Sequence, residues 1–132
     1  MIYLDSCALV KLLLPEAETG ALRAFLSEHR AKQHFTSALA LTEVPRAAIR
    51  VGADAAVLDA ADRMLTGITR IRLTEDLLRE AGRHPGPTLR SLDAIHLVTA
   101  NRLRRALDAF ITYDHRLAKA ATAADLPVCV PA

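Results

Sequence analysis

The stretch Met1-Ile2-Tyr3-Leu4-Asp5-Ser6 opens the sequence and decides how the rest of the chain is arranged. Its apolar run, Ile2 to Leu4, contains no turn residue, which is typical of a buried β-strand. Asp5 ends the run, and Ser6 is a suitable cap for a helix that begins at Ala8. Ligands of open α/β sheets bind outside the carboxyl ends of the strands. Because a lone buried charge is costly, a carboxylate here needs a metal ion, a partner or water, and we expect further functional residues around Asp5.

Strand-like and helix-like segments alternate along the whole chain, which predicts a parallel sheet covered by helices on both faces. Pro45 lies inside one predicted helix and should kink it. The one clear loop, Gly82 to Pro87, is too short to separate domains, so we expect a single domain over residues 1–132. The predicted strands are 2–4, 34–36, 70–73, 109–113 and 126–130, and the predicted helices are 8–14, 15–30, 37–51, 54–66, 74–81, 91–103 and 115–121.

Composition limits the class of protein. A chain of 132 residues with 52% apolar side chains can bury a core. Charged residues interrupt every apolar stretch, so we expect no membrane span, and no signal-peptide pattern opens the sequence. Cys7 and Cys129 lack metal-ligand spacing and are expected to be reduced, small apolar residues of a cytoplasmic protein. The net charge of +2 neither requires nor excludes a nucleic-acid partner.

Four acidic residues stand in unusual places. Asp114 follows an apolar strand directly, as Asp5 does, so both carboxylates should lie at the same edge of a parallel sheet. Glu43 and Asp93 lie near the starts of apolar helices, and neither has a cation four residues later. Other interpretations stay open: Asp5 and Asp114 as helix caps, Asp93 as a first-turn acid, and Glu43 as a surface residue paired with Arg46.

Carboxylates that share one crevice repel each other, and a divalent cation would relieve this repulsion. Mg²⁺ and Mn²⁺ prefer oxygen ligands and keep water molecules for a phosphate substrate, which would suit a nuclease. Zinc is disfavoured because Cys7 is isolated and the histidines show no ligand spacing. These histidines are His29, His34, His84, His96 and His115.

Four stretches together resemble the PIN-domain family, and within it the VapC-type ribonuclease toxins. They occur in the family's order and cover essentially the whole chain. The stretches are Ile2 to Leu12, Thr36 to Val44, Leu92 to Ala100 and Phe110 to Ala121.

The resemblance implies a three-layer α/β/α domain with a central parallel sheet. It also implies an endoribonuclease that depends on Mg²⁺ or Mn²⁺ and acts on structured RNA such as tRNA or rRNA. Family members form homodimers and are inhibited by a VapB-type antitoxin. The family's acidic metal-site positions fall on Asp5, Glu43, Asp93 and Asp114, and its neighbouring hydroxyl residues fall on Ser6 and Thr112.

The chain departs from the family pattern at three positions. Cys7 stands where Ser is common, Pro45 stands where a helix-forming residue is usual, and His115 stands where a further acid sometimes occurs. We expect Pro45 to affect the aim of Glu43, and the absence of a fifth acid argues against a complete second metal site.

Arginine residues on the predicted helices are candidates for contact with RNA phosphates, Arg46 and Arg102 foremost. Three others are Arg50, Arg104 and Arg105. The alternative function is a PIN-like binding module without catalysis, but such a module should have lost one or more acids. A receiver domain would need paired acids after the first strand, and a haloacid-dehalogenase-type phosphohydrolase would need an acid at Cys7.

Overall fold

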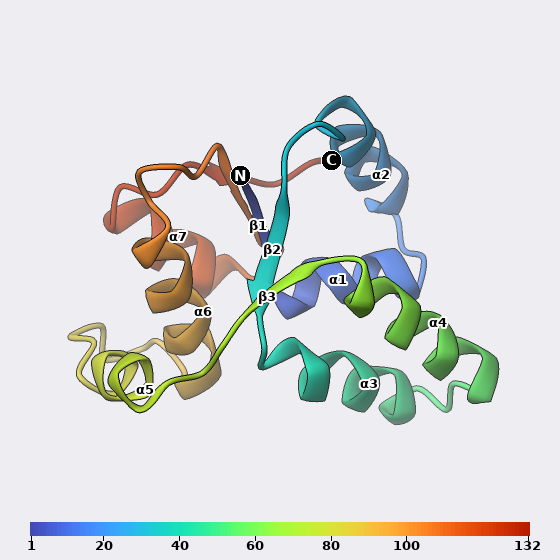
Figure 1. Ribbon diagram of the computed structural model, residues 1–132, viewed down its shortest axis with the longest axis horizontal. Helices are drawn as coiled ribbons and strands as arrows, with labels where there is room; N and C mark the ends of the chain where they lie inside the picture. Colours follow the sequence, from blue (N-terminus) through green and yellow to red (C-terminus); the bar gives the residue numbers. More distant parts are fainter.

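Five parallel strands form the centre of the computed structural model, which describes residues 1–132 (Figure 1). Their spatial order is β3-β2-β1-β4-β5, so the first strand of the sequence is the middle strand of the sheet. The strands are β1 (Ile2–Leu4), β2 (His34–Ser37), β3 (Thr69–Ile71), β4 (Ala109–Ile111) and β5 (Val128–Cys129). The helices are α1 (Ser6–Leu13), α2 (Thr19–Glu28), α3 (Ala40–Arg50), α4 (Ala55–Thr66), α5 (Glu75–Gly82), α6 (Ser91–Arg102) and α7 (His115–Ala123).

Helices cover both faces of the sheet, which confirms the predicted three-layer α/β/α arrangement. Figure 1 shows α1 to α4 on one side of the strands and α5 to α7 on the other. Successive side chains of a strand point to opposite faces. Ile2 and Leu4 therefore belong to the core under the first group of helices, while Tyr3 and Phe110 belong to the core under α6 and α7. None of the seven helices has the length and hydropathy that a membrane-spanning segment requires.

The sheet has a topological switch point between β1 and β4, where the chain changes the side on which it adds strands. From β1 the chain adds β2 and β3 on one side, then crosses to add β4 and β5 on the other. Leu4 pairs with Ile111, so the residues that follow these two strands leave the sheet side by side. A crevice for ligands forms at such a switch point, outside the carboxyl ends of the strands. The topology therefore places Asp5 and Asp114 at the position where an α/β protein binds its ligand.

Three local predictions were wrong in detail. The cap of α1 is Asp5, whose side chain accepts from the Ala8 N–H, and Ser6 is already the first helical residue. Helix α2 begins at Thr19 rather than Pro15, because the Thr19 hydroxyl donates to the Lys11 carbonyl at 2.8 Å and stabilises a turn between the helices. Ser37 belongs to β2, and α3 starts three residues later.

Two of the departures from the family pattern can be located in the fold. Cys7 is exposed, which is unusual for the small apolar residue expected from the sequence, and both cysteines are free. Pro45 lies inside α3, and the helix continues past it to Arg50. The carbonyl that Pro45 leaves without an intrahelical donor belongs to Leu41, which is 52% exposed and open to water.

Candidate active site

Asp5 lies at the switch point and is only 3% exposed. Its Oδ1 accepts from the Ala8 N–H at 2.8 Å, and its Oδ2 accepts from the Thr112 hydroxyl. Burial raises the pKa of the Asp5 carboxyl to about 6, although His96 and the two hydrogen bonds oppose the rise. Asp5 is thus both a helix cap and a buried acid with a raised pKa, so the two interpretations of the sequence are compatible.

Asp114 lies beside Asp5, and both residues form hydrogen bonds with the hydroxyl of Thr112. Its Oδ1 accepts from the Leu117 N–H at 2.8 Å and caps α7, while its own N–H donates to Thr112 Oγ1 at 3.1 Å. Thr112 is fully buried. One hydroxyl therefore holds the backbone of Asp114 and the carboxylate of Asp5 in a fixed relation, which agrees with the supporting role that the resemblance implies for Thr112.

Asp93 reaches the same crevice from the first turn of α6. Burial raises the pKa of the half-buried Asp93 carboxyl, and the charges of Asp114 and Glu43 raise it further. Asp93 in turn contributes to the raised pKa of Asp5. Asp93 therefore lies near enough to Asp5, Asp114 and Glu43 for their charges to affect one another.

Glu43 points from α3 toward α1 and α6. Its Oε1 accepts from the Ser6 hydroxyl at 2.6 Å and lies 2.8 Å from His96 Nε2. Burial alone would raise the pKa of Glu43, but the hydrogen bonds with His96 and Ser6 outweigh it and lower the pKa below its ordinary value. The structure shows no ion pair between Glu43 and Arg46, and Pro45 does not turn the Glu43 side chain away from the crevice.

His96 is the residue that sequence reasoning missed. It is 1% exposed and touches Tyr3, Ser6 and Glu43. In the sequence it appeared only as one of five scattered histidines. The signal that could have found it was its spacing: His96 follows Asp93 by three residues, so both lie on one face of α6.

A cleft of about 300 Å³ borders this site, and Ser6 and Glu43 form part of its wall. Arg50 also lines the cleft, and its charge helps to lower the pKa of Glu43. The two arginines expected to contact substrate lie elsewhere. Arg46 is exposed on α3 outside the lining, and Arg102 forms an ion pair of 2.8 Å with Glu80 at the opposite end of α6 from Asp93.

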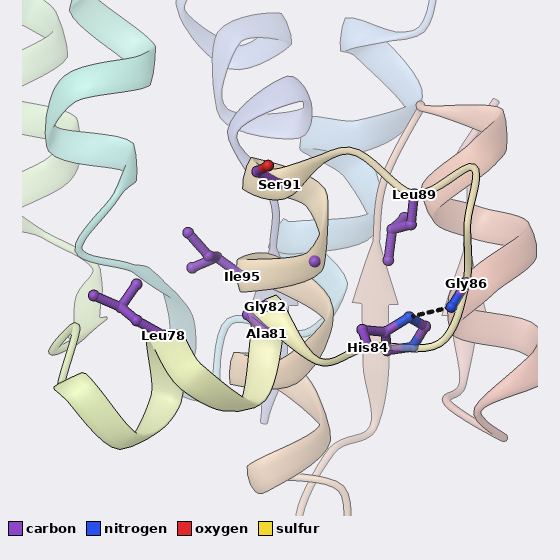
Figure 2. A pocket seen from close by; sticks show the side chains of 9 residues that line it. Leu78, Ala81, Gly82, His84, Gly86, Leu89, Ser91 and Ile95 are labelled. Carbon is purple, nitrogen blue, oxygen red and sulfur yellow. Dashed lines mark hydrogen bonds between the residues drawn. The ribbon is translucent and has the colours of Figure 1, made fainter.

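A second cavity, of about 220 Å³, lies between α5, the following loop and α6 (Figure 2). Ser91 and Ile95 line it from α6. At about 100° per residue, Ser91 lies about 140° to 160° around the helix axis from Asp93 and His96, and Ile95 lies about 160° from Asp93. The cavity in Figure 2 therefore opens on the other face of α6 and contains none of the four acids.

The donor set suits a hard divalent cation. All four acidic side chains offer oxygen, and the raised pKa values of Asp5 and Asp93 report buried charge that a cation would stabilise. No three His, Cys, Asp or Glu side chains are close enough together to hold an ion by direct contacts alone. Mg²⁺ retains several water ligands and needs only one or two direct carboxylates, so this spacing is compatible with it.

Comparisons with known proteins agree with this arrangement. The PIN domain family matches residues 2–123. Ribonuclease VapC47 of Mycobacterium tuberculosis (strain CDC 1551 / Oshkosh) is 42% identical over 119 residues, which cover 89% of this chain and 87% of that protein.

Two crystal structures share the fold. VapBC2 from Rickettsia felis, bound to a DNA fragment from its promoter, has a TM-score of 0.75 at 13% identity and covers 100% of both chains. Mycobacterium tuberculosis VapC20, described as a Sarcin-Ricin loop cleaving toxin, has a TM-score of 0.72 at 21% identity and covers 91% of this chain and 95% of its own.

The chain therefore belongs to the PIN domain family. Within that family it is of the VapC type, which confirms the resemblance seen in the sequence.

Proposed function

We propose that this chain is a metal-dependent endoribonuclease that hydrolyses phosphodiester bonds in structured RNA such as tRNA or rRNA. The observation that carries the proposal is that Asp5, Glu43, Asp93 and Asp114 lie near the carboxyl ends of the central strands, where the charges of Asp114 and Glu43 raise the pKa of Asp93 and the charge of Asp93 raises the pKa of Asp5. The ribonuclease name of a relative 42% identical supports the reaction class.

Each residue of the site has a separate task in this proposal. Asp5, Asp93 and Asp114, completed by Glu43, would hold Mg²⁺ or Mn²⁺, directly or through water. The chemistry that such an ion supplies is charge neutralisation of the phosphodiester and activation of water. Thr112 fixes Asp5 and Asp114, while Ser6 holds one oxygen of Glu43. Arg50, which lines the cleft and has no ion-pair partner, is placed to bind a phosphate of the RNA.

The direct test is cleavage of a pool of total tRNA and rRNA by the purified protein without a partner. Reactions contain Mg²⁺, Mn²⁺ or EDTA. Discrete fragments that require the metal are expected. Folded protein that binds Mn²⁺ but produces no fragments from any RNA would instead favour the binding-module alternative.

We further propose that the chain pairs with a VapB-type antitoxin and forms a homodimer. A structural neighbour was solved as VapBC2, which supports the first partner. The homodimer is supported by large exposed apolar side chains, because exposed apolar patches mark protein–protein interfaces. These side chains concentrate on α3, just after it, and on α5 and α6. These side chains are Leu41, Ile49, Val51, Leu78 and Leu92.

A further inference from the structure

The buried ring of His96 connects three elements of the fold at the edge of the acidic crevice. Its Nδ1 lies 2.8 Å from the Tyr3 hydroxyl on β1. Its Nε2 lies 3.1 Å from Ser6 Oγ on α1 and 2.8 Å from Glu43 Oε1 on α3. Both ring nitrogens therefore have partners, although the side chain is almost completely inaccessible to water.

The chemistry of these partners assigns the protons. A carboxylate only accepts hydrogen bonds, so the nitrogen that faces Glu43 carries the proton. A tyrosine phenol ordinarily titrates only at about pH 10, so Tyr3 keeps its proton at neutral pH and donates it to Nδ1. In its Nε2–H form, the ring accepts a hydrogen bond from Tyr3 in the core and donates one to Glu43 in the site. The position of Tyr3 therefore helps to fix the position of Glu43.

Two donors consequently meet on one oxygen of Glu43. The Ser6 hydroxyl donates to Oε1, and His96 Nε2–H donates to the same atom. Oε2 has no hydrogen-bond partner in the protein, and Glu43 lines the cleft of about 300 Å³. Fixing Oε1 in this way leaves Oε2 as the oxygen that can reach a ligand.

We propose that His96 is a positioning residue that, together with Tyr3, fixes Glu43 so that its Oε2 serves the divalent cation of the site. This inference rests on the proposed function, since it assigns Glu43 a role in metal binding. Partners that orient metal ligands contribute about tenfold to a hundredfold to metal affinity. A histidine that merely filled the core would affect stability but would not act through Glu43.

The test is a double-mutant cycle on Mn²⁺ affinity, measured by electron paramagnetic resonance on the RNA-free protein. The variants are His96→Leu, Glu43→Gln and the combination of the two. His96→Leu is expected to weaken Mn²⁺ binding about tenfold to a hundredfold, but to cause little further loss once Glu43 is already Gln. Additive losses would overturn the inference, because His96 would then act independently of Glu43.

Conservative and control variants separate positioning from damage to the core. The amide of His96→Gln can donate to Glu43 and accept from Tyr3, so this variant is expected to recover most of the Mn²⁺ affinity, also where His96→Leu does not fold. Val98→Ala removes buried volume from the same helix without touching an acid, and it should lower stability while Mn²⁺ binding is retained. A loss of Mn²⁺ affinity in Val98→Ala as large as the tenfold to hundredfold loss expected for His96→Leu would contradict the positioning role, because damage to the core alone would then explain both losses.

Cleavage assays on the same samples distinguish a failure of this inference from a failure of the proposed function. Wild-type protein that cuts RNA but shows additive losses overturns the inference and leaves the proposed function standing. Non-additive losses in a protein that binds Mn²⁺ but cuts no RNA support the inference and contradict the function. Wild-type protein that binds no Mn²⁺ contradicts the role of His96 directly.

Discussion

At the scale of single residues, Asp5 affects the stability of the fold in two opposite ways. Its Oδ1 caps α1 and stabilises the fold, while burial of its charge destabilises the fold. Burial raises the pKa from 3.8 to about 6 in the folded state. Below the lower value Asp5 is neutral in both folded and unfolded chains, and above the higher value it is charged in both. The free energy of unfolding therefore decreases as the pH rises between the two values.

The variant Asp5→Asn removes this titration and keeps the cap, since Asn caps helices as well as Asp does. In EDTA, the free energy of unfolding of Asp5→Asn minus that of the wild type should rise by up to about 3 kcal/mol between about pH 4 and pH 7. Urea unfolding at a series of pH values measures the difference. A difference that does not change with pH would contradict the raised pKa of Asp5.

The two arginines Arg50 and Arg102 can be compared directly. Arg50 lines the cleft beside Glu43, whereas Arg102 is paired with Glu80 far from Asp93. Arg50→Gln should weaken RNA binding and reduce its salt dependence, with a slope smaller by about one for each phosphate that Arg50 neutralises. Arg102→Gln serves as the control and should leave both quantities near the wild-type values. The reverse result would support the sequence-based choice of Arg102.

At the scale of helices and strands, local chemistry explains where most elements begin and end. The strand-end positions of Asp5 and Asp114 could be predicted from apolar runs alone. Glu43 and Asp93 stood out as acids in apolar helices, but only the family resemblance assigned them to the site, because such a pattern does not distinguish a residue that faces water from one that faces a crevice. The three-residue spacing of His96 from Asp93 places both on one face of α6, but its hydrogen-bond partners Tyr3, Ser6 and Glu43 lie on three other elements and only the folded chain brings them together. The assignment of Ser6 as the cap failed since Asp5, one residue earlier, accepts the hydrogen bond instead.

Two glycines at helix ends should respond in opposite directions to the same substitution. Gly20 lies in the first turn of α2 with no atom within 4 Å of an added Cβ, so Gly20→Ala should stabilise the protein by about 0.5–1 kcal/mol. Gly52 follows α3 with a φ of 74°, so Gly52→Ala should destabilise it by about 1 kcal/mol, although there is space for the methyl group. Urea unfolding of both variants tests the pair, and equal signs would be inconsistent with these backbone conformations.

At the scale of the whole molecule, some of the exposed apolar residues lie close to the acidic site. Leu92 lines the same cleft as Glu43, and Leu41 and Ile49 lie on one side of α3, about 80° apart around its axis. An interface over these helices would place a second copy near the site. Such an arrangement depends on how distant segments come together, which is why composition and periodicity alone did not predict it.

The homodimer is expected to depend on this surface. The double variant Leu41→Asp with Ile49→Asp should sediment as a monomer in analytical ultracentrifugation, because two buried charges oppose apolar association. Val130 is equally exposed, at 50%, but lies after β5 at the edge of the sheet. Val130→Asp should therefore remain a dimer, and loss of the dimer in this control alone would place the interface elsewhere.

The most direct test of the central claim compares two aspartates that cap helices in the same way. Asp5 caps α1 and lies in the crevice, while Asp54 caps α4 through a hydrogen bond of 3.1 Å from the Val57 N–H and is exposed. Single-turnover cleavage of the RNA pool in Mn²⁺ should be lost in Asp5→Asn and unchanged in Asp54→Asn, with both proteins folded. Retained cleavage by Asp5→Asn at saturating metal would contradict the assignment of the carboxylate crevice as the active site.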